Sequence, residues 1–339
     1  MKEMNNASLR DRALGALQGI SLGDALGMPT QSMSHQWIQD AYGKIEGLVN
    51  AISDEPIAPN MPAGSVTDDT EQALLVAGLI VKGKGHIDPH ELAASLLSWE
   101  DSMKAKGSLD LLGPSTKFAL EQVRNGADIN QTGQTGTTNG AAMRVAPVGL
   151  AHRVTSSGFE NFVYESCRVT HNTVPGFRSA LIVAASVSFG MEAESTRDAI
   201  SHALRYAESI HSRGAWSPKA DVLTRTRLAL EFAKENEGNP DFQDMLRNEF
   251  GTSVESNESV PVALCLAWHY AENPLGALLA AANIGGDTDT IASIAGGILG
   301  ASSGTEAFPK EFTEQVSMVS NLNLAPIADS LVDLREQDE

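Results

Sequence analysis

The chain has 339 residues, of which 24 are lysine or arginine and 43 are aspartate or glutamate, so its formal net charge is −19. This acidic balance argues against nucleic acids and anionic membrane surfaces as partners, because both bind basic patches. The two cysteines, Cys167 and Cys265, lie in apolar helical patterns, where free thiols are expected and one disulfide stays open. No apolar signal core or bilayer-length apolar run occurs, which favours a cytoplasmic protein.

Helical patterns account for much of the first third of the chain. Apolar residues keep a loose helical period over residues 8–28, and Pro29 ends it because proline lacks a backbone N–H. The segment from there to residue 62 is rich in Pro, Asn, Gly and Ser without a clear period. We expect a long loop there, which in a compact domain is often functional. Further helices are predicted from about Thr70 to Val81, from Asp88 onward, and from Gly113 to about Val123.

A polar segment, residues 130–140, has the composition of a flexible surface linker, and composition alone favours that interpretation. It leads into residues 141–147, where a helix is predicted to begin. The free N–H groups at such a start can bind a phosphate, and Arg144 could assist. The sequence therefore leaves a linker and a phosphate-binding loop as alternatives.

The second half of the chain is also helical in pattern. A lone histidine at a helix end, here His171, is more often a capping or surface residue than a catalytic one. Alternating strand patterns are scarce, and no internal repeat is evident. Helices are predicted over residues 159–169, 174–189, 197–210, 222–234 and 241–250, from about 259, and over 275–282, 311–319 and 327–335.

The most informative motif is Asp-Thr-Asp-Thr at residues 287–290. It follows a pair of glycines and precedes a run of small apolar residues, which predicts a helix buried nearly all round. Asp287 is placed to cap this helix, and Asp289 and Thr290 fall in its first turn. Capping alone is the commoner role of an acid at a helix start.

A second, similar arrangement makes a metal site the stronger interpretation. Residues 67–70, Thr-Asp-Asp-Thr, again place hydroxyls and acids before an apolar helix. Helix dipoles cannot neutralise four converging acids, and oxygen ligands without His or Cys favour Mg²⁺, Mn²⁺ or Ca²⁺ over zinc. A domain boundary between the motifs would divide the site, so we predict one all-α domain over residues 1–339. The cluster would consist of Asp68, Asp69, Asp287 and Asp289.

Five motifs, in the same order, resemble those of the ADP-ribosylglycohydrolase family, which includes dinitrogenase reductase-activating glycohydrolase and the ADP-ribosyl hydrolases. The resemblance covers nearly the whole chain and implies a single-domain, orthogonal all-α helical bundle with two divalent cations, Mg²⁺ or Mn²⁺. The motifs occupy residues 23–27, 67–70, 139–144, 170–171 and 285–290.

The resemblance also implies roles for individual residues. Two positions differ from many members of the family. Gln31 stands where they carry a glutamate, and the loop reads Thr138-Asn139-Gly140 where they have an extra glycine before the asparagine. The implied metal ligands are Thr67, Asp68, Asp69, Asp287, Asp289 and Thr290. The implied diphosphate loop consists of Asn139, Gly140, Ala141 and Met143, with His171 on its ribose-phosphate side.

The expected chemistry is hydrolysis at the anomeric carbon of a ribosyl group, with ADP-ribose removed from a protein side chain or a small-molecule conjugate. Asp68 or Asp69 would take the proton of the attacking water, and Gln31 would orient water or sugar, since an amide cannot act as a base. Two alternatives stay open. One is a hydrolase of a smaller ribosyl metabolite or nucleoside, and the other is a catalytically weak ADP-ribose-binding protein.

Overall fold

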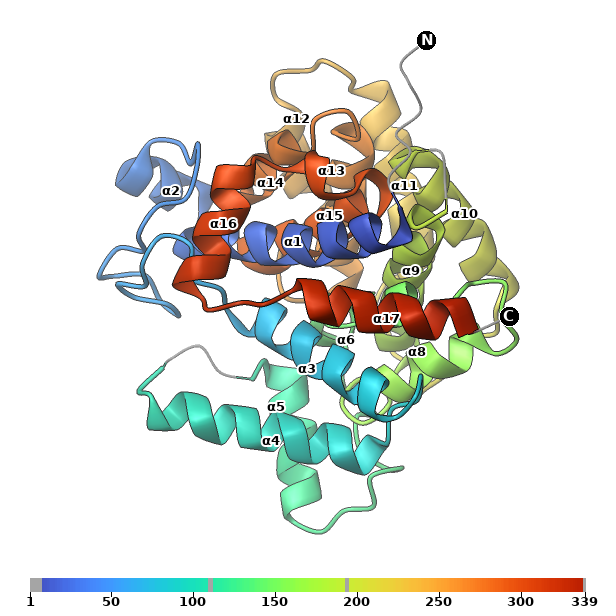
Figure 1. Ribbon diagram of the computed structural model, residues 1–339. Helices are drawn as coiled ribbons and strands as arrows, with labels where there is room; N and C mark the ends of the chain where they lie inside the picture. Colours follow the sequence, from blue (N-terminus) through green and yellow to red (C-terminus); the bar gives the residue numbers. More distant parts are fainter. Residues whose placement is uncertain (1–7, 109–111, 193–194, 338–339) are drawn as a thin grey trace.

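The computed structural model describes residues 8–108, 112–192 and 195–337, and in these ranges the chain folds into helices (Figure 1). Backbone pairing of the β type is limited, in the same ranges, to isolated bridges such as that between Met33 and Gly286. The all-α prediction is confirmed. The prediction of one domain over residues 1–339 stays a prediction.

The first ten helices are α1 (Leu9–Gly27), the 3-10 helix η1 (Met28–Thr30), α2 (His35–Tyr42), α3 (Asp68–Lys82), α4 (Pro89–Ala105), α5 (Pro114–Arg124), α6 (Gly140–Met143), α7 (Ala146–Ala151), α8 (Phe159–Cys167) and α9 (Val174–Gly190). The remaining ones are α10 (Thr196–Ser209), α11 (Val222–Glu235), α12 (Phe242–Phe250), α13 (Ser256–His269), α14 (Pro274–Ile284), α15 (Thr288–Ser303), the 3-10 helix η2 (Thr305–Ala307), α16 (Lys310–Val319) and α17 (Ala325–Gln337).

Most predicted helices are present within a few residues of their expected bounds, and α2 is the main exception. The sequence predicts a loop there, which is wrong over residues 35–42. This helix is only eight residues long, and Ile38 is its one buried side chain, so it leaves no periodic apolar pattern. It is stabilised locally by Ser34, whose hydroxyl caps the N-terminus by accepting from Trp37 N.

Helices α1 and α15 lie side by side at the centre of the molecule (Figure 1). Their backbones touch because glycines face one another: a Cβ atom on Gly19 would lie 2.1 Å from the carbonyl oxygen of Gly296. The prediction of a helix buried nearly all round is confirmed, since every residue of α15 before Ser303 is buried. At the end of α1, Gly27 meets Asp289, so this contact places the first turn of α15.

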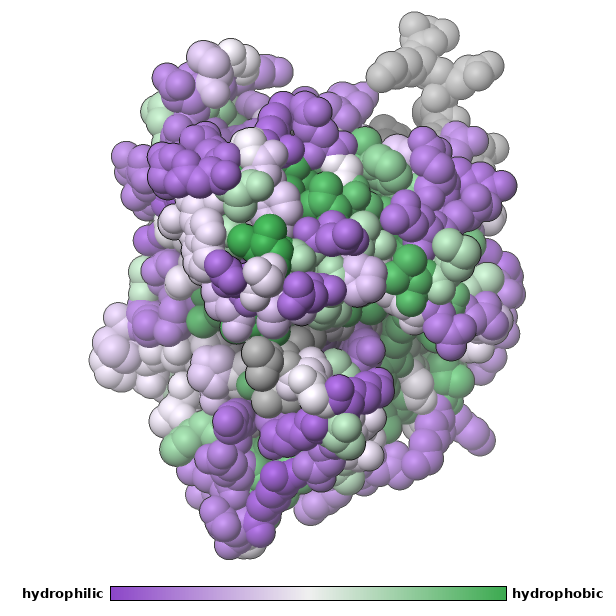
Figure 2. All heavy atoms as spheres, turned by 90° about the vertical axis from the view of Figure 1, so that its left-hand side faces the viewer, coloured by the Kyte–Doolittle hydropathy of each residue, from purple (hydrophilic) through white to green (hydrophobic). Residues whose placement is uncertain are grey.

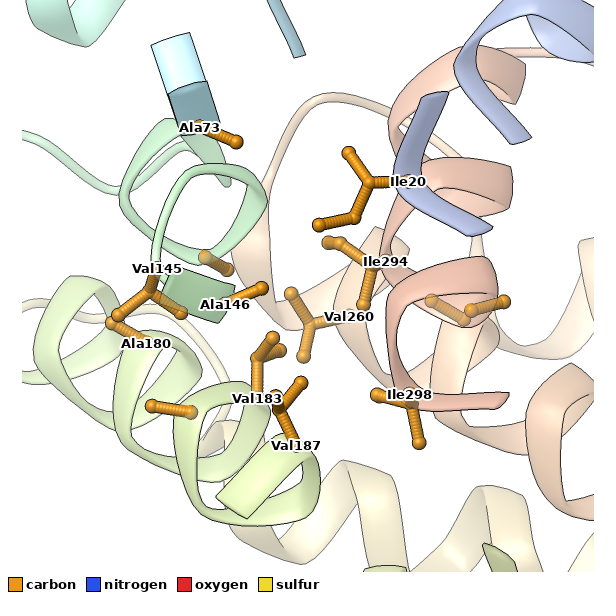
Figure 3. Close-up of a cluster of buried hydrophobic side chains, with 14 of the residues drawn as sticks. Ile20, Ala73, Val145, Ala146, Ala180, Val183, Val187, Val260, Ile294 and Ile298 are labelled. Carbon is orange, nitrogen blue, oxygen red and sulfur yellow. The ribbon is translucent and has the colours of Figure 1, made fainter. Parts of the chain in front are cut away.

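Apolar side chains from distant segments pack around this helix pair (Figure 3). Ile20 of α1 and Ile294 of α15 face Val183 of α9 and Val260 of α13, and all four are buried. Burial of such side chains is the main favourable contribution to folding. The same packing fixes the starts of the helices that carry the acidic motifs.

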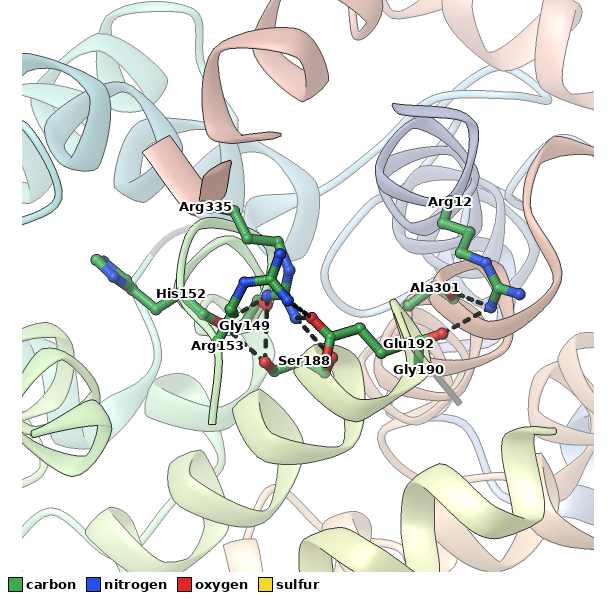
Figure 4. A network of polar contacts seen from close by, with 9 residues as sticks. All are labelled: Arg12, Gly149, His152, Arg153, Ser188, Gly190, Glu192, Ala301 and Arg335. Atoms are coloured by element: carbon green, nitrogen blue, oxygen red, sulfur yellow. Dashed lines mark hydrogen bonds and ion pairs between the residues drawn. The ribbon is translucent and has the colours of Figure 1, made fainter. Parts of the chain in front are cut away.

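Two buried arginines, one on the central helix α1 and one on α17, donate hydrogen bonds to neighbouring helix ends (Figure 4). Arg335 of α17 donates through Nη1 to the carbonyl oxygens of Gly149 at 2.9 Å and His152 at 2.6 Å, and its Nη2 lies 3.0 Å from a carboxylate oxygen of Glu192. Arg12 of α1 donates to the carbonyl of Gly190 at 2.7 Å. These guanidinium groups satisfy carbonyls that helix ends leave without partners.

The face of the molecule that carries α2 and α16 is largely hydrophilic, with hydrophobic residues in small, separate patches (Figure 2). In the described ranges, none of the helices has the length and apolar character needed to cross a bilayer. Cys167 and Cys265 are buried free thiols, as expected, and burial raises the pKa of Cys167 to about 12.

Candidate functional site

The two acidic motifs meet at the ends of their helices. The hydroxyl of Thr290, in the first turn of α15, donates to Oδ2 of Asp69, in the first turn of α3, at 3.0 Å. Both side chains are buried, and the second carboxylate oxygen of Asp69 is buried without a hydrogen-bond partner. The predicted convergence of the motifs is therefore confirmed.

The cluster carries more negative charge than its surroundings compensate. Burial, followed by repulsion from Asp289, raises the pKa of Asp69 well above its usual value. Burial, followed by repulsion from Asp287, does the same to Asp289. Among the described residues, no three His, Cys, Asp or Glu side chains stand as a preformed metal site. The ligand roles of the acids and of Thr67 and Thr290 thus stay predictions.

The start of α3 is held by Asp24 of α1, a residue for which the sequence analysis gave no role. Its fully buried carboxylate accepts from the backbone N–H of Thr67 at 2.9 Å and of Thr70 at 3.0 Å. It also accepts from their hydroxyls, at 2.8 and 2.5 Å. Burial raises the pKa of Asp24 to about 6. A polar residue inside the apolar pattern of residues 9–27 was the signal that could have identified it.

A buried positive charge stands behind Asp68. Gln72 donates to the Asp68 carboxylate at 2.8 Å, and Arg144 donates to the Gln72 carbonyl oxygen at 3.3 Å. Arg144 is completely buried, which lowers its pKa to about 10, so the guanidinium stays protonated at neutral pH. The predicted role of Arg144 at a phosphate is not supported by its position, because it does not line the cavity described below.

The start of α15 is shaped by a glycine turn. Gly285 and Gly286 have φ values of +86° and +85°, which glycine adopts without strain. Asp287 occupies the N-cap position, but its side chain makes no capping hydrogen bond, so the capping prediction is wrong. Its carboxylate instead accepts from Nδ2 of Asn139, which draws the loop before α6 against the acids.

A cavity of about 360 Å³ opens in front of the cluster. Gln31 lines it and is only 6% exposed, and its Nε2 has no hydrogen-bond partner. The other predicted site residues on its wall are Asp68, Asn139, Gly140, Met143, Asp287, Asp289 and Thr290. Thr67, Asp69, Ala141 and His171 are buried and are not among the wall residues.

The sequence model of the ADP-ribosylglycohydrolase family matches residues 5–339. The chain belongs to this family. It is 29% identical over 331 residues to the uncharacterized protein YegU of Escherichia coli (strain K12), covering 97% of this chain and 98% of YegU. It is 24% identical to the ADP-ribosyl-[dinitrogen reductase] glycohydrolase of Rhodospirillum rubrum, covering 99% and 100%.

The fold is shared with a solved structure described as an ADP-ribosylglycohydrolase-related protein complex. The TM-score is 0.71 at 21% sequence identity, over 96% of this chain and 99% of that chain. The predicted ADP-ribosylglycohydrolase-type helical fold is therefore confirmed. The resemblance recognised from five short motifs extends over residues 5–339 of this chain.

In this member of the family, the loop before α6 is ordered and is not a flexible linker. Asn139 N donates to the carbonyl of Val254 at 2.8 Å, and Ser256 N donates to that of Thr137 at 3.0 Å. His171 lies behind this loop and is fully buried, so its interpretation as a surface residue is wrong. A substrate contact for His171 stays a prediction.

The sequence analysis missed several wall residues, and Lys117 is the charged one among them. Lys117, on the exposed side of α5, lines the cavity together with Gly113, Pro114 and Thr116. Among the described residues that line the cavity, the other charged side chains are all aspartates. Its side chain brings positive charge to a cavity whose inner end is acidic, an arrangement that suits a ligand with an anionic portion.

Proposed function

We propose that this protein hydrolyses a ribosyl glycosidic bond with the aid of two divalent cations, Mg²⁺ or Mn²⁺. Its substrate would be an ADP-ribosylated protein side chain or an ADP-ribosyl small molecule. The observation that carries the proposal is the contact between Thr290 and Asp69, which brings two acidic helix starts to one end of a cavity. The name of the Rhodospirillum rubrum relative, a glycohydrolase of an ADP-ribosylated protein, supports the substrate class.

The donor set fits such cations. The buried oxygen of Asp69 lacks a partner, and burial and mutual repulsion raise the pKa values of Asp69 and Asp289, so cations bound there would stabilise the charged forms of these acids. The hydroxyl proton of Thr67 is committed to Asp24, which leaves the oxygen lone pairs for a cation. Bound cations would act as Lewis acids and lower the pKa of a water molecule. The residues that would hold them are Thr67, Asp68, Asp69, Asp287, Asp289 and Thr290.

The remaining chemistry belongs to side chains of this chain. Asp68 lines the cavity and is the better placed of the two candidate bases, whereas Asp69 is buried behind the wall. Gln31 lines the cavity and its buried Nε2 has no hydrogen-bond partner, so a sugar hydroxyl oxygen or a water bound beside it would accept this missing bond. Its neutral amide orients its partner and takes no proton. Holding sugar and water together in this way lowers the barrier by positioning alone.

Lys117 favours a phosphate-bearing substrate over a simple nucleoside. The cavity is of the size that small-molecule sites usually have, and its inner end is acidic. The proposed cations would offset the acids of that end, and a diphosphate farther along the cavity would gain from a positive charge on the wall. Lys117 supplies this charge on the wall itself, while Arg144 supplies it only from behind the wall.

The proposal is tested with chelator-treated protein, to which Mg²⁺ or Mn²⁺ is added back. ADP-ribosyl-arginine, ADP-ribosyl-serine and adenosine are offered as substrates, and ribosyl release is measured by chromatography. We expect metal-dependent turnover of an ADP-ribosyl compound and none of adenosine. Asp289→Asn should lose both turnover and the metal-induced rise in Tm, whereas the exposed control Asp40→Asn should keep both.

Other outcomes would replace the proposal. Turnover by metal-free protein, or by Asp289→Asn, would refute the metal mechanism. Turnover of adenosine in preference to the ADP-ribosyl compounds would establish the smaller-substrate alternative. Tight ADP-ribose binding without turnover at any metal concentration would establish a binding protein, for which Gln31 in place of a carboxylate would be the reason.

A further inference from the structure

A chain of hydrogen bonds runs from the buried guanidinium of Arg144 to the cavity wall. Arg144 Nη2 bonds to Oγ1 of Thr170, which lies 2.8 Å from Nδ1 of His171. The other ring nitrogen, Nε2, lies 3.0 Å from Oγ1 of Thr138. The first three residues are completely buried, and Thr138, at 8% exposed, is the member that lines the cavity.

The direction of each hydrogen bond follows from the arginine. A guanidinium group only donates, so the Thr170 oxygen accepts from Arg144. The hydroxyl proton of Thr170 then points to its other neighbour, Nδ1 of His171, which accepts it. A neutral imidazole that accepts at Nδ1 carries its proton at Nε2. His171 therefore donates to Thr138, whose oxygen accepts.

The environment keeps His171 neutral. Burial, followed by the charge of Arg144, holds the pKa of His171 well below its usual value. A second ring proton would also be directed at the Thr170 hydroxyl, which already accepts from a guanidinium. Donation toward Thr138 is thus the stable arrangement at neutral pH.

Thr138 consequently has one proton left to donate. Within the described part of the chain, its hydroxyl has His171 as its hydrogen-bonding neighbour, and Thr138 itself lines the cavity. The adjacent Thr137 differs, because its hydroxyl donates to a carboxylate oxygen of Glu255 at 2.9 Å and it does not line the cavity. Two neighbouring threonines of one loop thus have different hydrogen-bond partners, and Thr138 is the one on the cavity wall.

We propose that Thr138 is a substrate-binding residue whose hydroxyl, oriented by Arg144, Thr170 and His171, donates a hydrogen bond to a diphosphate oxygen of the ADP-ribosyl substrate. The proposal rests on the proposed function for the identity of the ligand. It also gives His171 a positioning role, since a ring behind the wall acts on the ligand through Thr138.

Binding of ADP-ribose and of adenosine, measured by calorimetry, tests this role, because adenosine lacks the diphosphate. Thr138→Val keeps the shape of the side chain and deletes the hydroxyl. We expect it to weaken ADP-ribose binding about tenfold, the usual scale for a hydrogen bond to a charged group, and to leave adenosine binding unchanged. Thr138→Ser should restore ADP-ribose binding. The matched control Thr137→Val should bind both ligands as the unsubstituted protein does.

The results separate this proposal from the proposed function. If the unsubstituted protein binds ADP-ribose and Thr138→Val binds it equally well, or loses both ligands alike, the role of Thr138 is refuted and the proposed function stands. If the unsubstituted protein does not bind ADP-ribose, both are refuted.

Nitrogen NMR of protein labelled at histidine tests the hydrogen-bond direction without any ligand. The His171 signals are assigned by their loss in His171→Gln. We expect Nε2 to be protonated and Nδ1 unprotonated at neutral pH. A ring protonated at Nδ1 would leave the Thr138 proton directed at His171, and the proposal would then be wrong.

Discussion

The starts of α3 and α15 carry nearly the same residues but are held by different means. At α3, buried polar groups provide the support: Asp24 accepts from four donor groups, the backbone N–H and the hydroxyl of both Thr67 and Thr70, and Gln72 donates to Asp68. At α15, backbone contact provides it. A Cβ atom on Gly27 would lie 2.4 Å from the backbone of Asp289, and a glycine turn precedes the helix.

This difference separates two ways of building one site. Hydrogen bonds at α3 fix how hydroxyls and carboxylates are turned, and they respond to the protonation and charge of their partners. Steric contact at α15 fixes where the helix begins, and it responds only to volume. Substitutions at the two helix starts should therefore fail in different ways.

The largest expected effect is that of Gly27→Ala, which disrupts the close backbone contact between α1 and the start of α15. The new methyl group would overlap backbone atoms, which cannot rotate away, so α1 and α15 must separate. We expect a loss of about 3 kcal/mol in the free energy of unfolding, measured in urea. The control is Gly78→Ala in α3, where no atom lies within 4 Å and a gain of about 0.5 kcal/mol is expected. Equal stability of both variants would contradict the steric account.

Asp24→Asn disrupts the hydrogen bonds that hold the start of α3 and should have the next largest effect. One carboxylate oxygen becomes an N–H group that faces donors of Thr67 or Thr70, so at least one buried donor loses its acceptor. We expect a loss of about 2 kcal/mol in urea unfolding, together with a smaller metal-induced rise in Tm. Asp11→Asn, at the exposed end of α1 where Asp11 accepts from Thr305, should cost about 1 kcal/mol or less. A normal metal response in Asp24→Asn would show that Thr67 needs no orientation.

The pH dependence of the free energy of unfolding tests whether the buried hydrogen-bonded ring of His171 stays neutral in the folded protein. The low pKa of folded His171 means that the unfolded chain takes up a proton below about pH 6.5 while the folded protein does not. The free energy of unfolding should therefore fall on acidification, by up to about 1.4 kcal/mol per pH unit for this group. His171→Gln should lose this part of the slope. Parallel slopes in both proteins would mean that the buried ring accepts a proton in the folded state.

The smallest expected effect concerns the cavity wall rather than the helix starts. Lys117→Gln should raise KM for an ADP-ribosyl substrate about fivefold, and less at high salt, because the side chain is exposed and its charge is screened. Lys310→Gln, an exposed lysine on α16 outside the cavity, serves as the control. If Lys117→Gln left KM unchanged at low salt, Lys117 would not be the positive charge that favours the substrate, and Arg144 would be left in that role.

Much of the fold could be predicted from local patterns. The N-cap Asp88, the apolar periods and the breaks at proline indicated most helices within a few residues. The small residues of α15 predicted a helix that packs closely on all sides, and this is confirmed. Helix α2 could not be found in this way, because a single buried side chain makes no period.

The residues of the candidate site also fall into two groups, those with a local sequence pattern and those that depend on contacts with distant segments. The acids were found because carboxylates and hydroxyls before two apolar runs are an unusual local pattern. Asp24, Lys117 and the hydrogen bonds of Arg144 were not, because their importance lies in contacts with segments far away in the sequence. For Asp287, the local pattern gave a wrong prediction. Its position suggested a helix cap, but its carboxylate accepts a hydrogen bond from Asn139 of the neighbouring loop instead.

By itself, the amino-acid order determined most of the helices, the close packing around α15 and the two acidic motifs, since each depends on neighbours along the chain. Only the tertiary structure decided which oxygens face the cavity, which are committed to Asp24, and how Thr138 is turned. These outcomes depend on burial and hydrogen bonding between segments tens to hundreds of residues apart. Such contacts exist only once the core of α1 and α15 has brought those segments together.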